Sequence, residues 1–145
     1  MAYIKTKPGE YDVDDFIKGL DEQQQRESHA LINLMKDVTK QLPIMYGSSI
    51  IGFDSYHYRS KSGSEGIWPR IGFSPRKGKI SLYLTFDAES YLSYVEGLGG
   101  KNSIGKGCIY LQKFDRVDQS KLRALIEQAY KDSFDSTKSM EVTDK

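Results

Sequence analysis

Many of the side chains that could carry chemistry lie in one segment, Gly52 to Phe73. It holds His57, one of two histidines, between Tyr56 and Tyr58, and it holds the single tryptophan, Trp68. A histidine beside two phenols suggests acid–base chemistry, but consecutive residues of a strand point to opposite faces. His57 therefore shares a pocket with neither tyrosine unless a bulge intervenes. A hydrogen-bonded structural histidine is the competing interpretation.

Two hydroxyl groups precede this segment, at Ser48 and Ser49. An enzyme built on either serine would use His57 as the general base. Such a base needs a third group to orient it, and the sequence shows no such group at a diagnostic spacing. An enzyme is therefore kept as an alternative, behind a binding function.

The loop GKNSIGKG, Gly100 to Gly107, has the glycine and lysine spacing of a phosphate-binding P-loop. It lacks the final Ser or Thr that would hold magnesium, and a strand is expected to follow it where a P-loop has a helix. Nucleotide hydrolysis is not predicted, although the loop amides could still form an anion-binding nest. A solvated loop whose glycines serve its bends is the competing interpretation. The cations that would accompany the nest are Lys101, Lys106, Arg76 and Lys77.

Metal binding by side chains requires several histidines, cysteines or carboxylates that converge at ligand distance. Cys108, His29 and His57 are far apart and show no paired spacing. Acidic residues near the N-terminus are the feature that could attract iron, with Asp12, Asp14 and Asp15 as candidates. The competing interpretation is a favourable run of acids at a helix N-terminus, where the helix dipole stabilises negative charge.

Composition limits the partners that we expect. The 145 residues carry a net charge of +1, which gives no overall attraction to nucleic acids or membrane surfaces. One cysteine excludes an internal disulfide, and the short apolar runs predict neither a secretory signal nor a spanning helix. A cytoplasmic location is therefore expected, with no nucleic acid and no membrane as partner.

Hydrophobic periodicity predicts helices and strands in a mixed order. Spacings of three and four predict helices, and an alternation of two predicts strands, most clearly in KISLYLTF. The repeated triplet IGF suggests a hairpin centred near Gly63, with Phe53 opposite Phe73 and with Phe53, Ser55, His57 and Ile71 on one face. The expected helices cover 13–20, 23–42, 87–98 and 118–134, and the expected strands cover 50–58, 68–74, 79–86 and 108–114.

The hairpin would place Tyr56, Tyr58 and Trp68 together on its other face. Such a face can stack against a small ring, or it can be covered by a helix and become core. The fold class follows from the order of elements: α+β, a single domain with an antiparallel sheet of about four to five strands packed against N-terminal and C-terminal helices. Residues 1–11 form an extension, 12–134 the domain and 135–145 a polar tail.

Several motifs occur in an order that resembles the YdhG-like family of bacterial domains of unknown function. They are the SYHY element, the G-x-W-P turn at Gly66 to Pro69, the FSPRK turn and the GKG-C-x-Y-L segment. The resemblance covers nearly the whole chain and implies a small α+β domain with an antiparallel sheet packed against helices. Members are sometimes labelled frataxin-like intracellular iron chaperones, without a ligand set to carry over. This chain departs from the family pattern at Tyr46, where tryptophan is common, and at Gly107, where serine is frequent.

We therefore expect a non-enzymatic binding module for a small anionic ligand or a protein segment. Iron binding at the acidic residues is the first alternative, and an enzyme using Ser48 or Ser49 with His57 is the second. No cofactor is expected unless iron is bound. The candidate ligand-binding residues are Tyr46, Ser48, Ser49, Tyr56, His57, Tyr58, Trp68, Arg76, Lys77, Lys101 and Lys106.

Overall fold

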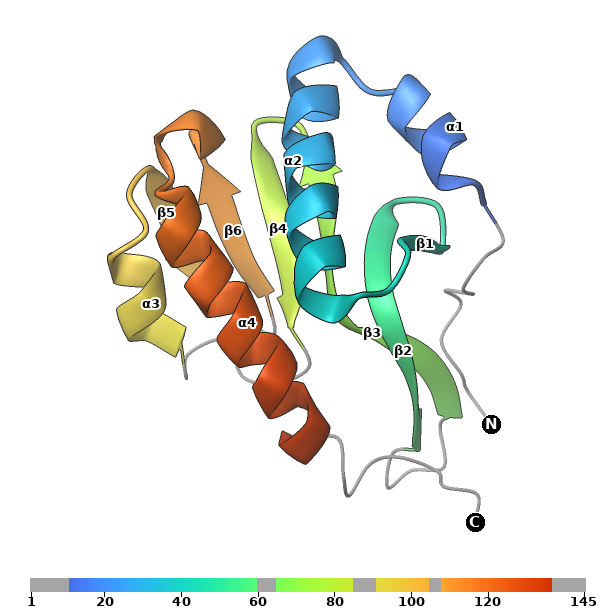
Figure 1. The fold of residues 1–145 in the computed structure, drawn as a ribbon. Helices are drawn as coiled ribbons and strands as arrows, with labels where there is room; N and C mark the ends of the chain where they lie inside the picture. Colours follow the sequence, from blue (N-terminus) through green and yellow to red (C-terminus); the bar gives the residue numbers. More distant parts are fainter. Residues whose placement is uncertain (1–10, 60–64, 85–90, 105–107, 137–145) are drawn as a thin grey trace.

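The computed structural model describes residues 11–59, 65–84, 91–104 and 108–136, with backbone alone at 57–59, 65, 84, 135 and 136. These residues form one α+β domain in which an antiparallel sheet packs against helices, as the sequence predicts (Figure 1). The helices are α1 (Val13–Lys18), α2 (Glu22–Thr39), α3 (Leu92–Glu96) and α4 (Gln119–Ser136), with a 3-10 turn η2 (Phe114–Arg116). The strands are β1 (Ile44–Tyr46), β2 (Ile50–Arg59), β3 (Glu65–Arg76), β4 (Lys79–Leu84), β5 (Lys101–Ile104) and β6 (Cys108–Gln112).

The sheet has six strands in the order β1-β2-β3-β4-β6-β5, so the prediction of four to five strands is too low. The two additional strands, β1 and β5, are three and four residues long and form the two edges. Both are too short to show a period of two in the sequence. In the complete sheet β3 and β4 are the two central strands, and β6 lies next to β4.

Helix ends are fixed by the local chemistry that the sequence indicates. The Asp12 carboxylate caps α1 by accepting from the Asp15 amide at 3.1 Å, and Asp118 caps α4 by accepting from the Ser120 amide at 2.9 Å. Asp21 and Gln24 form a reciprocal capping box at the start of α2. Both α1 and α2 end before the predicted residues, and the predicted helix over 87–98 is confined to α3 within the described residues.

The β2–β3 register differs from the predicted one by two residues. Phe53 pairs with Ile71 and Ile51 pairs with Phe73, so the prediction that Phe53 faces Phe73 is wrong. Antiparallel strands run in opposite directions, so the two IGF triplets align on their middle residues, Gly52 and Gly72. Close approach explains these glycines, because a Cβ at Gly72 would lie 2.8 Å from the Ile51 carbonyl oxygen.

The side-chain alternation of β2 is interrupted at Asp54, whose φ is 60°. Phe53 is fully buried in the core, and the next residue, Asp54, accepts a hydrogen bond from the Tyr130 hydroxyl of α4 at 2.5 Å. Two consecutive side chains therefore point toward the helices, and the residues beyond them exchange faces. The prediction that Phe53 and Ser55 share a face is wrong, because the Ser55 hydroxyl is hydrogen-bonded to that of Tyr46 on the other side.

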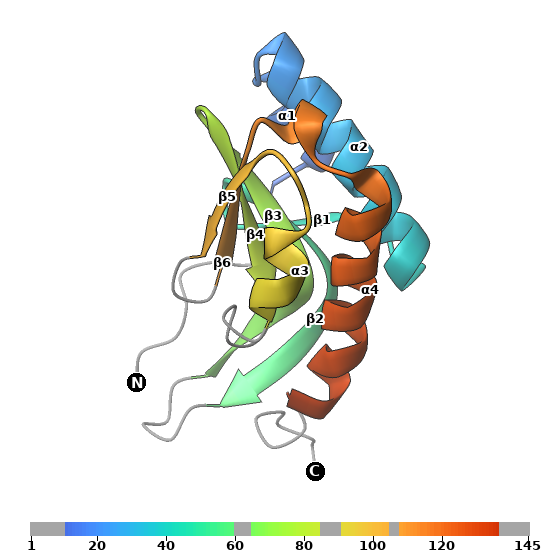
Figure 2. The ribbon, with the colours of Figure 1, turned by 90° about the vertical axis from the view of Figure 1, so that its left-hand side faces the viewer.

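The core lies between the sheet and helices α2 and α4, which cover the same sheet face (Figure 2). Helix α2 contributes Leu31 and Met35, and α4 contributes Leu125 and Ile126. No helix among the described residues lies on the opposite side of the sheet, which we call the helix-free face. This face is where the strands present polar and aromatic side chains.

Candidate functional site

The central strands supply the helix-free face by simple alternation. In β4, Ile80 and Leu82 enter the core, so Ser81 and Tyr83 point the other way. In β6, Ile109 and Leu111 enter the core in the same manner, which turns Cys108 and Tyr110 to the helix-free face. The β4–β6 register then places Tyr83 opposite Cys108 and Ser81 opposite Tyr110.

Two cations and three aromatic rings meet on this face, and we call this set the aromatic–cation patch: Trp68, Arg76, Lys79, Tyr83 and Tyr110. Arg76 Nη2 donates to the Tyr83 hydroxyl at 3.3 Å. The Trp68 and Tyr83 rings meet edge to face with centroids 6.3 Å apart, an arrangement that aromatic pairs prefer. The Lys79 ammonium lies 4.4 Å from the centre of the Tyr110 ring, within cation–π range.

The two cations start from directly paired positions, because Arg76 faces Lys79 across the β3–β4 ladder. Beneath them lie Ser74 and Ser81, which are 0% and 2% exposed. The Ser74 hydroxyl donates to the Ser49 carbonyl oxygen at 2.6 Å, which ties the base of the patch to the residue before β2. The patch therefore lies over a packed and hydrogen-bonded part of the sheet.

The neighbours of Tyr110 alter its protonation equilibrium. A hydrogen bond with Cys108 is the largest influence and raises the pKa of the Tyr110 phenol, whereas the nearby Arg76 guanidinium acts to lower it. The net effect is an increase, so Tyr110 keeps its proton at neutral pH. Its single hydroxyl proton is directed at Cys108, so Tyr110 contributes to the patch through its ring.

Two aromatic residues that were predicted to bind the ligand, Tyr46 and Tyr56, are not part of the aromatic–cation patch. Tyr46 is 1% exposed, and burial raises the pKa of its phenol. Its ring packs where a Cβ on Gly52 would lie, 2.6 Å from Tyr46 Cε1. Tyr56 is buried below Arg70, whose guanidinium carbon lies 5.6 Å from the centre of the Tyr56 ring. Tyr56 is paired directly with Trp68 across the β2–β3 ladder, and such partners share a face.

Arg70 belongs to a separate cluster that holds the end of α4 to the sheet, and we call this cluster the α4 anchor: Asp54, Arg70, Tyr130, Ser133 and Phe134. Arg70 is 7% exposed and donates through Nη1 to the Ser133 carbonyl at 3.1 Å. Its guanidinium carbon lies 4.1 Å from the centre of the Phe134 ring. Desolvation, followed by the hydrogen bond to Asp54, raises the pKa of Tyr130 well above its usual value.

The remaining predicted residues do not converge on one site in the described structure. Ser48 is exposed in the turn after β1, Lys77 is exposed in the β3–β4 turn, and Lys101 is exposed at the start of β5. The side chains of His57 and Tyr58 lie outside the described residues, as does Lys106. The enzyme alternative with Ser48 or Ser49 and His57 accordingly stays a prediction.

The glycine loop around Lys101 has a backbone reason for two of its glycines. Gly99 and Gly100 have φ values of 82° and 75°, which strongly favour glycine. A Cβ on Gly99 would also lie 2.7 Å from the Arg116 carbonyl oxygen. These glycines therefore serve the entry into β5, and the prediction of a loop is wrong over Lys101–Ile104, which form a paired strand.

The acidic candidates for iron lie at the start of α1. Asp12 uses its carboxylate to cap the helix, and Asp14 and Asp15 occupy the first turn. Within the ranges that the structure describes, no three histidine, cysteine or carboxylate side chains form a group able to hold a metal. Iron binding stays a prediction for which the described geometry offers no ligand set.

Sequence reasoning identified Trp68 and Arg76 of the patch and missed Lys79 and Tyr110. The signal for Tyr110 is the alternation in CIYLQ, where it lies between two core residues. Lys79 begins KISLYL, and the same alternation places it on the side of Tyr83. Extending the period of two across both strands would therefore have found the whole patch.

Comparison with known proteins gives no relative: no family model, no curated protein and no solved structure matches the chain. The resemblance to the YdhG-like family stays a prediction. Within the described ranges, no helix has the length and apolar character needed to cross a membrane. The function proposed below therefore follows from the geometry of this chain.

Proposed function

We propose that the protein is a non-enzymatic binding module whose aromatic–cation patch takes a small anionic ligand that carries a planar ring. The observation that carries this proposal is the contact of Arg76 with Tyr83 and of Lys79 with Tyr110 on the helix-free face. No carboxylate of the described residues forms a salt bridge with Arg76 or Lys79. Their charges are therefore available to a ligand.

The chemistry of the patch suits an anion with an aromatic body. A guanidinium and an ammonium that start from paired positions can share one phosphate or carboxylate, with Arg76 as the group suited to a bidentate contact. Trp68 and Tyr83 offer ring surfaces for stacking next to the cations.

The limits of the partner class follow from charge and composition. Because the net charge is +1, attraction of the anion is local to the patch and does not extend to a long polyanion such as a nucleic acid. A single cysteine is in keeping with the cytoplasmic location that we propose for the module. A protein segment that presents an acidic and an aromatic side chain would use the same chemistry.

Thermal denaturation with phenyl phosphate, benzoate and inorganic phosphate tests the proposal. A ligand that binds only the folded state stabilises it by about 2.7 kcal/mol at one hundred times its Kd. For a chain of this size, that is a rise in Tm on the order of 5–10 °C. Phenyl phosphate should raise Tm more than inorganic phosphate does, because only the former has a ring.

Variants at the patch and beside it separate specific binding from general charge effects. Arg76→Gln and Lys79→Gln should each abolish most of the Tm rise. Lys77→Gln is the matched control, because Lys77 is exposed in the same turn. This substitution removes the same charge. An equal loss with Lys77→Gln, or no rise with any of the three anions, would refute the proposal.

A further inference from the structure

Lys101 lies on the helix-free face, outside the aromatic–cation patch. Its partner across the β5–β6 ladder is Gln112. Gln112 follows the core residue Leu111, so it points to the helix-free face. Direct partners share a face, and Lys101 therefore points to the same side. Ile104, which has the opposite parity in β5, packs against the core as this alternation requires.

The cations of the helix-free face form one row across the sheet. Arg76 and Lys79 are direct partners, and the β4–β6 register, continued by one residue, places Lys79 next to Gln112. Gln112 in turn pairs with Lys101. Neighbouring strands lie about 4.8 Å apart, so the Lys101 backbone is about 10 Å from that of Lys79. The paired Arg76 and Lys79 can share one anionic group, and Lys101 is placed to meet a second.

The described strands offer this row no neutralising carboxylate. Their acidic residues are Asp54 and Glu65. Asp54 accepts a hydrogen bond from Tyr130 of α4, and Glu65 lies at the end of β3 that is far from Arg76. No salt bridge of the described residues includes Lys101 or either cation of the patch. The positive charge of the row is therefore open to a ligand.

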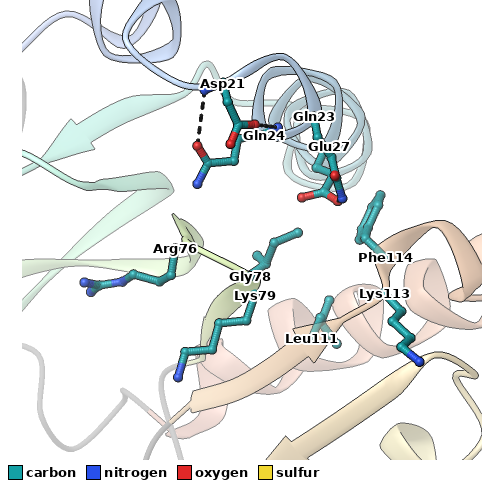
Figure 3. Close-up of a pocket in the computed structure, with 11 residues that line it drawn as sticks. Asp21, Gln23, Gln24, Glu27, Arg76, Gly78, Lys79, Leu111, Lys113 and Phe114 are labelled. Carbon is teal, nitrogen blue, oxygen red and sulfur yellow. Dashed lines mark hydrogen bonds between the residues drawn. The ribbon is translucent and has the colours of Figure 1, made fainter.

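The nearby acids of α2 lie on the other side of the sheet. In Figure 3, which views the cavity below the first turns of α2, the charged ends of Arg76 and Lys79 point away from Asp21 and Glu27. The Asp21 carboxylate accepts from the Gln24 amide at 2.7 Å, so it serves the cap of its own helix. Like charges on directly paired residues, such as Arg76 and Lys79, destabilise a sheet. An anion bound across the row would relieve this repulsion.

The surface beside the row is aromatic and polar. The next residues on this face are Ser81, Tyr110 and Ser103, which pair across β4, β6 and β5. Ser103 is exposed and shares a strand and a face with Lys101, so its hydroxyl can donate to an anion that Lys101 holds. The Tyr110 ring lies between Ser103 and the Lys79 ammonium. A planar ligand that reaches from Lys79 to Lys101 therefore crosses an aromatic ring.

We propose that the ligand of the patch carries two anionic groups, on opposite sides of its ring, and that Lys101 and Ser103 bind the second group. This inference rests on the proposed function, because the first anionic group is the one that Arg76 and Lys79 bind. The body of the ligand crosses Tyr110. The ligand class is an aromatic compound with two phosphate or carboxylate groups, since a single anionic group engages only one end of the row.

Fluorescence titration of Trp68, the single tryptophan, tests this proposal. The probes are phenyl phosphate, 1,4-phenylene bisphosphate and 1,2-phenylene bisphosphate. The two bisphosphates carry the same charge, but only the 1,4-isomer has its phosphates on opposite sides of the ring. The 1,4-isomer should bind on the order of fivefold more tightly than phenyl phosphate, as expected for one added exposed ion pair. Equal affinities of these two probes would overturn the proposal.

Variants at Lys101 separate a second anion site from general attraction by charge. Lys101→Gln should remove the fivefold gain and leave the affinities for phenyl phosphate and the 1,2-isomer unchanged. Lys101→Arg keeps the charge and should keep the gain. Lys36→Gln is the matched control, because Lys36 is exposed on α2, on the other side of the sheet. A gain that survives in Lys101→Gln, or an equal loss for both bisphosphates, would refute the assignment.

Failure of this inference is distinguishable from failure of the proposed function. If phenyl phosphate binds and Arg76→Gln abolishes its binding, while the 1,4-isomer shows no gain, the second anion site alone is refuted. If phenyl phosphate does not bind to the unmodified chain, the proposed function fails and this inference fails with it.

Discussion

Replacement of Arg70 by methionine should remove the main connection between the end of α4 and the sheet. The side chain is nearly enclosed, and its guanidinium joins the Ser133 carbonyl, the Asp54 carboxylate and the Phe134 ring. Methionine has a similar length and flexible packing, so it leaves little cavity. The change therefore measures the charge and its hydrogen bonds more than the volume of the side chain.

The magnitude follows from three contacts. A hydrogen bond from a charged donor, here to the Ser133 carbonyl, contributes about 1.5–3 kcal/mol. The contact with the Phe134 ring adds about 0.5–1 kcal/mol, because Phe134 is itself exposed. The pairing with Asp54 is 3.8 Å long and its carboxylate is 24% exposed, so solvent screening reduces it to about 0–1 kcal/mol. We expect a total loss of about 2–5 kcal/mol, a large part of the ~5–15 kcal/mol of a typical domain.

Urea unfolding followed by fluorescence and circular dichroism measures this loss as a lower midpoint with an unchanged slope. Hydrogen exchange should show faster opening of the last turns of α4, with α2 unaffected. Arg26→Met is the matched control, because Arg26 is exposed on α2. A loss below about 0.5 kcal/mol, equal to that of the control, would refute the view that the α4 anchor stabilises the fold.

Two further predictions concern the sheet and the tyrosines. Gly72→Ala should cost about 1–3 kcal/mol in urea unfolding, because the new Cβ would meet the Ile51 carbonyl oxygen at 2.8 Å and backbone cannot yield cheaply; a neutral result would contradict the register. Stability should fall as pH rises above about 10, because Tyr130 keeps its proton when folded, whereas an unfolded tyrosine loses it near pH 10. Tyr130→Phe should reduce that alkaline slope in unfolding measured between pH 9 and 11, and an unchanged slope would refute the assignment. The matched controls are Gly97→Ala, where the nearest atom to a Cβ lies at 3.9 Å, and Tyr11→Phe at an exposed position.

The sequence predicts elements well where one period persists. Helix α4 and strand β4 each place apolar residues on one face for several turns or pairs, and both have their core residues where the pattern predicts. Strands β1 and β5 are not predicted from the sequence, because three or four residues are too few to show an alternation of apolar and polar side chains. They are strands because they pair with longer neighbours. Tertiary pairing therefore decides these short segments.

The candidate site was predictable in part for a related reason. Alternation places Arg76 and Tyr83 on the helix-free face without any knowledge of the register. The left-handed conformation of Asp54 exchanges the faces of β2 beyond it, and alternation has no means of detecting such a change. An aspartate inside a run of strand-forming residues is the weak signal that marks the position. The sequence left open whether Tyr56 belongs to a stacking surface or to the core, and the structure buries it below Arg70.

The short edges of the sheet bear on how the protein behaves at high concentration. An exposed edge strand offers unpaired amide and carbonyl groups to other chains, and long edges lead to aggregation. In the described sheet, β1 has three residues and follows Pro43, and β5 has four residues and begins at Lys101. Proline removes an amide donor and lysine adds a charge that repels a second copy. Strand β1 covers β2 only from Ile50 to Gly52, so residues 53–59 have β3 as their single strand neighbour in the described sheet and form its longest unpaired edge.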